Sequence, residues 1–93
     1  MTNLEIVRNF VIENFLYGDS GRLHDDTLFS EDGIIDSTGV LELVGFLEER
    51  FGIQVEDEDF SMENMNSLRR IDAFLVRKLS QNHSQNLSQK MSL

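Results

Sequence analysis

The residues best placed for chemistry are Asp36 and Ser37, which follow an apolar pair and come directly before a helical pattern. After them, apolar side chains recur at the spacing of one helix face: Val40, Leu43, Val44, Leu47 and Phe51. Ser37 therefore lies where a loop becomes a helix, beside backbone N–H groups that have no intrahelical partner. Because a helix N-terminus carries partial positive charge and free donors, it can hold a phosphate ester. The pattern makes the Ser37 hydroxyl a candidate for modification.

Catalysis by this serine would require a base within hydrogen-bond reach and a group to orient that base. The two histidines, His24 and His83, belong to no recognisable constellation, and we expect the first to be a solvated loop residue. The chain has no cysteine, no phosphate-binding glycine loop and no zinc motif. We therefore predict a protein that is not an enzyme, with no catalytic residue and no metal site. The alternative role for Asp36 or Ser37 is simply to cap the helix.

Two amphipathic patterns flank the long segment that leads to this serine. The first helix begins with the capping-box spacing of Thr2 and Glu5 and runs to about Leu16. A loop follows to about residue 36, and its apolar pairs, Leu28-Phe29 and Ile34-Ile35, should pack onto a helical core. The second helix runs from Ser37 or Thr38 to about Arg50, with Gly52 as its stop. Gly39 and Gly45 lie outside its apolar stripe. Close approach of a partner or prosthetic group would explain these glycines, and so would simple tolerance of glycine by a packed helix.

The C-terminal half predicts one short helix, one long helix and a tail. The acidic run at residues 56–59 predicts the first turn of a short helix, with Phe60 as its apolar anchor. Asn66 or Ser67 can cap a last helix, whose face carries Leu68, Ile71, Leu75 and Leu79. Residues 80–93 are rich in Ser, Gln and Asn, and we expect a disordered tail after a domain of residues 1–79. The fold class is all-α, a four-helix bundle with three main helices, one short helix and a long loop between helices one and two.

The charge of the chain is strongly acidic and unevenly distributed. The formal net charge is −9. Residues 31–59 contain ten acidic residues and a single basic residue, Arg50. Such a surface repels nucleic acid and attracts partners with basic surfaces, in a salt-dependent manner. No signal peptide and no apolar run of membrane-spanning length is visible. We expect a cytoplasmic monomer that does not span a membrane.

Several short motifs together give a resemblance over roughly residues 1–79. Ser37 is followed by Glu at five and eleven residues and by Phe-Gly-Ile at fourteen to sixteen residues. The full set is Leu28-Phe29, Gly33, Asp36-Ser37, Glu42-Leu43, Glu48-Glu49, Phe51-Gly52-Ile53 and Val55. This set resembles the acyl carrier protein family, the phosphopantetheine carriers of acyl and peptidyl chemistry. Thr38, Gly39 and Gly45 depart from the fatty-acid carriers, so the chain looks more like discrete carriers such as the D-alanyl carrier protein.

The resemblance implies a function and a set of partners. It implies 4′-phosphopantetheine on Ser37, next to Asp36, with an acyl or aminoacyl group held as a thioester and presented to partner enzymes. Those partners would be a phosphopantetheinyl transferase, an AMP-forming acyl or aminoacyl ligase, and a downstream acyltransferase or synthase. The family's docking positions correspond here to Thr38, Leu41, Glu42, Glu48 and Glu49.

Two other functions are alternatives to the carrier hypothesis. The first is an unmodified acidic helical adaptor that binds a basic partner protein through helix two. The second is a calcium-responsive protein using the acids at residues 56–59, although this run lacks the ligand spacing of an EF-hand loop.

Overall fold

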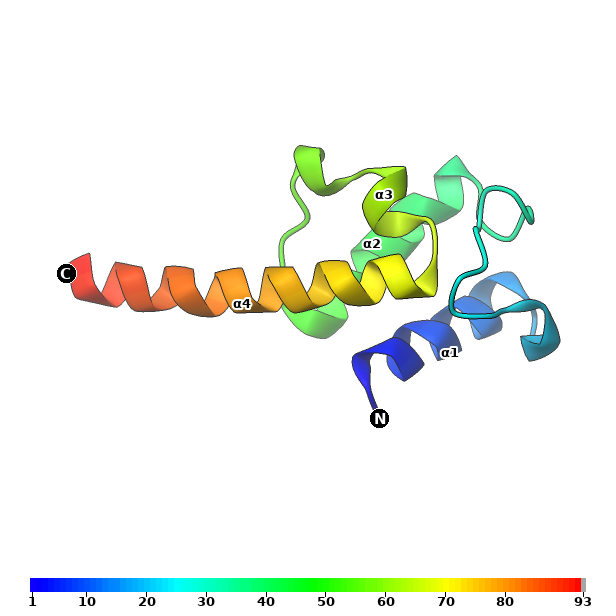
Figure 1. The fold of residues 1–93 in the computed structure, drawn as a ribbon, viewed down its shortest axis with the longest axis horizontal. Helices are drawn as coiled ribbons and strands as arrows, with labels where there is room; N and C mark the ends of the chain where they lie inside the picture. The colour runs from blue at the N-terminus through cyan, green and yellow to red at the C-terminus, as the bar shows by residue number, and fades with distance from the viewer. Residues whose placement is uncertain (93) are drawn as a thin grey trace.

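The structure, a computed structural model, describes the backbone of residues 1–92 and the side chains of residues 1–80. Four α-helices and two short 3₁₀ turns make up the described chain: α1 (Asn3–Phe15), η1 (Ser20–Arg22), α2 (Ser37–Phe51), η2 (Asp57–Asp59), α3 (Met62–Met65) and α4 (Leu68–Ser92). Within these residues there is no strand, and Figure 1 shows α1, α2 and the first half of α4 gathered at one end of the molecule. The all-α bundle predicted from the sequence is confirmed.

Helix α1 begins and ends as its sequence predicts. The Thr2 hydroxyl accepts a hydrogen bond from the backbone N–H of Glu5 at 3.1 Å, which satisfies one of the donors left free at the helix start. Val7 and Val11 are buried, and the helix gives way to a turn at Leu16. That turn directs the chain into the long loop that reaches α2.

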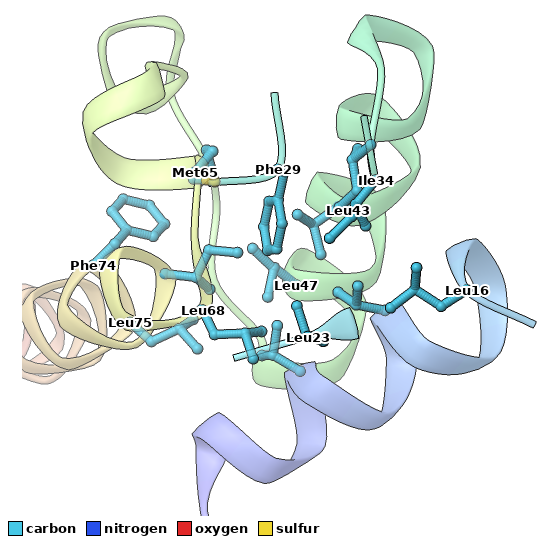
Figure 2. Close-up of a cluster of buried hydrophobic side chains, with 14 of the residues drawn as sticks. Leu16, Leu23, Phe29, Ile34, Leu43, Leu47, Met65, Leu68, Phe74 and Leu75 are labelled. Atoms are coloured by element: carbon cyan, nitrogen blue, oxygen red, sulfur yellow. The ribbon is translucent and has the colours of Figure 1, made fainter. Parts of the chain in front are cut away.

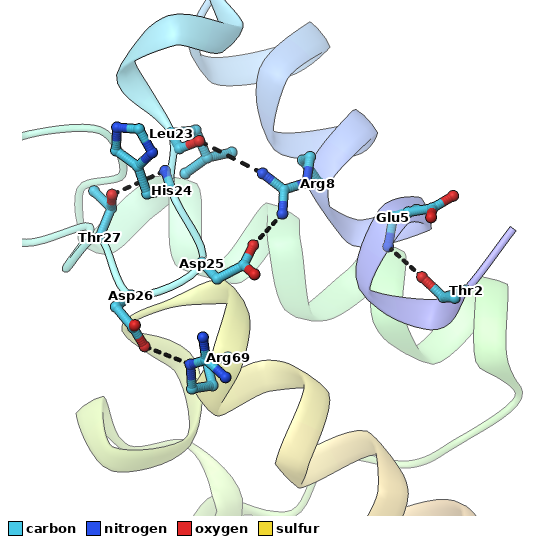
Figure 3. A network of polar contacts seen from close by, with 9 residues as sticks. All are labelled: Thr2, Glu5, Arg8, Leu23, His24, Asp25, Asp26, Thr27 and Arg69. Carbon is cyan, nitrogen blue, oxygen red and sulfur yellow. Dashed lines mark hydrogen bonds and ion pairs between the residues drawn. The ribbon is translucent and has the colours of Figure 1, made fainter.

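The long loop between α1 and α2 packs against the core and is held by ion pairs. Phe29, Ile34 and Ile35 are buried in the core as predicted, whereas Leu28 is only half-buried and is not part of the core cluster. Polar contacts hold the outer part of the loop: Arg8 of α1 pairs with Asp25, and Arg69 of α4 pairs with Asp26 at 2.5 Å (Figure 3). The loop therefore arrives at α2 in a fixed course, which sets where Ser37 lies.

The segment after α2 differs from its prediction. The acidic run forms only a 3₁₀ turn, closed by a reciprocal capping box between Glu56 and Asp59, and the short α-helix comes later at Met62–Met65. Phe60 is not a buried anchor, because its side chain is 42% exposed. Met65 is the buried residue of the segment. The capping box completes its turn locally, so the chain needs no apolar anchor at residue 60.

Helix α4 supplies much of the core. Its first turn is capped by Ser67, whose hydroxyl accepts from the backbone N–H of Arg70 at 3.1 Å. Leu68, Ile71, Phe74 and Leu75 are buried with the core residues of α1 and α2 (Figure 2). This confirms the apolar face predicted for the last helix.

The end of α4 departs from the sequence expectation. The helix continues through Ser92 and projects away from the bundle in Figure 1, whereas we expected it to end near Leu79. Residues 80–92 hold no glycine or proline, the residues that most strongly end a helix. The side chains after Ser80 and all of Leu93 lie outside the described residues, so the domain boundary at residue 79 and the disorder of residues 80–93 stay predictions. No helix in the described chain has the length and hydropathy needed to cross a bilayer.

Candidate functional site

Asp36 and Ser37 divide two roles at the start of α2. Asp36 is the N-cap, and its Oδ1 accepts a hydrogen bond from the backbone N–H of Gly39 at 2.7 Å. Ser37 is the first helical residue and is exposed to solvent. Because Asp36 performs the capping, the Ser37 hydroxyl is not needed for it. The helix start therefore presents an accessible hydroxyl beside the positive end of the helix dipole.

Buried residues on both sides of Ser37 fix its position. Ile34 and Ile35 lie in the core immediately before the cap. Gly39 is buried after it, and a Cβ at this position would lie 2.9 Å from Phe15 Cε1 and 3.0 Å from Ile35 Cγ2. Our placement of Gly39 away from the buried face was wrong. The glycine lets the first turn of α2 pack closely on the end of α1, and this holds Ser37 at the surface.

An apolar cavity opens beside Ser37. Its volume is about 310 Å³, and it is lined by Ser37, Val40, Phe60, Ser61, Met62, Met65 and Asn66. One wall belongs to the first turn of α2 and the other to the segment around α3. No acidic or basic side chain lines it. The site therefore offers an apolar surface to any group attached at the serine.

The predicted docking residues do not all have the same environment. Thr38, Leu41, Glu42 and Glu49 are exposed along α2, and the Leu41 side chain is 63% exposed. Glu48 is only half-buried, and its Oε2 accepts a hydrogen bond from the backbone N–H of Val55 at 2.9 Å. Four of the five residues thus present free surface, while Glu48 also holds the chain that follows α2.

Sequence reasoning missed the far wall of the cavity. Phe60 and Met62 were not predicted to lie near Ser37, although the apolar content of residues 60–65 in an otherwise acidic region was a usable signal.

The sequence also gave no sign of the ion pair between Lys78 Nζ and Asp59 Oδ2, which lie 2.8 Å apart. The hydrogen bond from Lys78, with a further one from the backbone N–H of Glu56, lowers the pKa of Asp59 below its usual 3.8.

Known proteins resemble this chain in sequence and in fold. No protein-family model matches it. A D-alanyl carrier protein of Streptococcus suis is 36% identical over 66 residues, covering 71% of this chain and 82% of the relative. That of Streptococcus sanguinis is 34% identical over 61 residues, covering 66% and 76%. The chain belongs to the acyl and peptidyl carrier protein family.

The fold agrees with this membership. The apo structure of KstB-PCP, a peptidyl carrier protein, is 37% identical to this carrier protein, with a TM-score of 0.66. The match covers 82% of this chain and 85% of that one. The resemblance drawn from the Asp-Ser motif and its spacings is thereby confirmed, and so is the function as a carrier that presents a thioester-bound group. Nothing in the comparisons favours the unmodified adaptor.

Proposed function

We propose that this carrier protein bears 4′-phosphopantetheine on Ser37 and presents an acyl or aminoacyl group to partner enzymes. The observation that carries the proposal is the exposed hydroxyl of Ser37 at the start of α2, with Asp36 already serving as the cap. When bound, the group supplies a terminal thiol that holds the cargo as a thioester. The protein itself carries no catalytic residue in this proposal.

The residues around Ser37 fit such a prosthetic group. A phosphodiester at this position would lie beside the positive end of the α2 dipole, which favours negative charge. The cavity beside the hydroxyl is apolar and large enough, at about 310 Å³, to receive part of an arm or its cargo. Among the apolar lining residues, Met65 is buried and Val40 packs against the core, whereas Phe60 and Met62 are 42% and 58% exposed.

The proposed docking surface lies along α2 next to this site. Thr38, Leu41, Glu42 and Glu49 form its exposed part, and Glu48 contributes its remaining free oxygen. The partners are a phosphopantetheinyl transferase, an AMP-forming acyl or aminoacyl ligase and a downstream acyltransferase or synthase. Their contact surfaces should be basic, because the surface from Glu31 to Asp59 is acidic. A cytoplasmic monomer suits such exchange among several enzymes.

Intact mass spectrometry tests the modification directly. The unmodified protein is incubated with coenzyme A and a broad-specificity phosphopantetheinyl transferase, and the mass should rise by one phosphopantetheinyl group. Ser37→Ala should show no gain. Ser61→Ala is the matched control, because Ser61 lines the same cavity and is half-buried, and it should be modified like the natural protein. An unchanged mass, under conditions that modify a known carrier, would count against the proposal.

A further inference from the structure

Residues 56–64, which we call the strap, contribute one wall of the cavity beside Ser37. Phe60, Ser61 and Met62 of the strap line the cavity opposite Ser37 and Val40 of α2. None of the nine residues is buried, so the strap has little apolar contact to hold it in place. Segments with little apolar burial open at a lower free energy than the core does. The contacts that do hold the strap therefore decide how often the cavity is open.

Both ends of the strap are fixed. At its start, the backbone N–H of Val55 donates to Glu48 Oε2 at 2.9 Å. After its end, Met65 is buried in the core and Asn66 is tied to the long loop. Asn66 accepts from the backbone N–H groups of Phe29 at 2.8 Å and Ser30 at 3.0 Å. The ends thus stay in place while the middle of the segment depends on other contacts.

Those other contacts are polar and all lead to one face of α4. Lys78 Nζ lies 2.8 Å from Asp59 Oδ2, and Arg77 donates to Asn64 Oδ1 at 2.7 Å. Arg70 adds a longer bond to the carbonyl oxygen of Met62 at 3.3 Å. The Lys78–Asp59 pair is the most sheltered of the three ion pairs among the described residues, with side chains 13% and 21% exposed. Inside the strap, Asn64 Nδ2 donates to the Asp59 carbonyl at 2.9 Å, so the two fastening points are linked to each other.

We infer that the cationic side chains of α4 act as a latch that keeps the strap in place as a wall of the cavity beside Ser37. Lys78 holds the strap at Asp59, in its middle, and Arg77 holds it at Asn64, next to the anchored end. Breaking these contacts lets the middle of the strap move while the ends remain anchored. The cavity then becomes more accessible from solvent. The latch does not require the prosthetic group. Only its effect on a group attached at Ser37 rests on the proposed function. A carrier built in this way controls exposure of an attached apolar group through an ionic contact distant from Ser37 in sequence.

Amide hydrogen exchange on the unmodified protein tests the latch. Lys78→Met removes the cation and keeps an unbranched side chain, so the amides of Phe60 and Asn64 should exchange about fivefold faster, the size expected from losing one partly sheltered ion pair. The amide of Leu47, in the core of α2, should be unchanged. Arg69→Met is the matched control, because it removes one cation from the same helix and breaks a pair with Asp26 instead. It should leave the strap amides at the natural rate.

Two further readouts separate the latch from a general loss of stability. Nile red, a neutral apolar dye, should bind several-fold more strongly to Lys78→Met than to the natural protein or Arg69→Met, with shifts of the Val40 and Met65 methyl signals. Salt at about 1 M, where the screening length is about 3 Å, should speed strap exchange in the natural protein but not in Lys78→Met. Strap exchange that is the same in Lys78→Met and the natural protein contradicts the inference, and so does a uniform rise that includes Leu47.

No coenzyme A or transferase enters these experiments. The latch can therefore fail while Ser37 is modified normally, and modification can fail while the latch behaves as inferred.

Discussion

At the scale of single residues, the start of α2 shows how one acid and one glycine leave a serine exposed and free of the capping role. Asp36 satisfies the N–H of Gly39, which a serine at the cap position would otherwise do with its own hydroxyl. Gly39 allows Phe15 and Ile35 to pack against the first turn without a side chain between them. Ser37 is left with an exposed hydroxyl on a rigid support. Its position is thus set by neighbours that would not themselves take part in the proposed modification.

The two glycines of α2 should respond in opposite ways to the addition of one methyl group. Gly39→Ala should lower the free energy of unfolding by about 1–3 kcal/mol, because the new Cβ would lie 2.9 Å from Phe15 Cε1. Gly45→Ala should raise it by up to about 1 kcal/mol, since nothing lies within 4 Å of that position and alanine favours the helix. Chemical denaturation of both variants measures the difference. Equal effects at the two positions would show that Gly39 is not closely packed.

At the scale of elements, the sequence predicted the helices that carry a regular apolar face and missed the parts that depend on polar contacts. The apolar periodicity of α1, α2 and the first half of α4 follows from burial against one core, so it is visible in the sequence. The strap has no such period, because Asp59 and Asn64 are held by cations thirteen or more residues away on α4. Likewise, nothing local to Glu48 predicts its bond to Val55, and nothing local to Asn66 predicts its bonds to Phe29 and Ser30.

The two faces of α2 should differ sharply in their tolerance of truncation. Leu47→Ala should lower the free energy of unfolding by about 2–5 kcal/mol, because the side chain is fully buried and a cavity would remain. Leu41→Ala is the matched control on the same helix, and its 63% exposed side chain should cost less than about 0.5 kcal/mol. Urea denaturation followed by circular dichroism measures both. A similar loss in the two variants would show that the faces are assigned incorrectly.

At the scale of the whole molecule, charge is divided between the docking surface proposed above and contacts that hold the fold. Most acids between Glu31 and Asp59 are exposed. The cations are fewer, and three of them form tertiary ion pairs: Arg8 and Arg69 with acids of the long loop, and Lys78 with Asp59 of the strap. Three of the eight basic residues thus take part in ion pairs. With a formal net charge of −9, the protein presents a negative field, which favours the basic partners proposed above.

The ion pair on the strap should make one part of the fold sensitive to acid. Lys78 donates to Asp59 and Arg77 lies near it, so the pKa of Asp59 is lowered from 3.8 in the folded protein. A lowered pKa means that the carboxylate stabilises the fold above the ordinary value and that this contribution is lost as the pH falls through the folded value. An NMR titration of the Asp59 carboxyl carbon should give a midpoint below 3.8, and Lys78→Met should move it upward. A midpoint unchanged by that substitution would mean that the pair does not form in solution.

The hydrogen bond between Glu48 and Val55 complicates any charge-reversal scan of the acidic helix. Replacing Glu48 by lysine would change the potential seen by an incoming enzyme and, at the same time, release the backbone just before the strap. Weaker binding of a partner enzyme to that variant could then reflect either lost recognition or a local loss of structure. Glu42 and Glu49, which are exposed and make no such bond in the described chain, are the better positions for testing the proposed recognition by charge reversal.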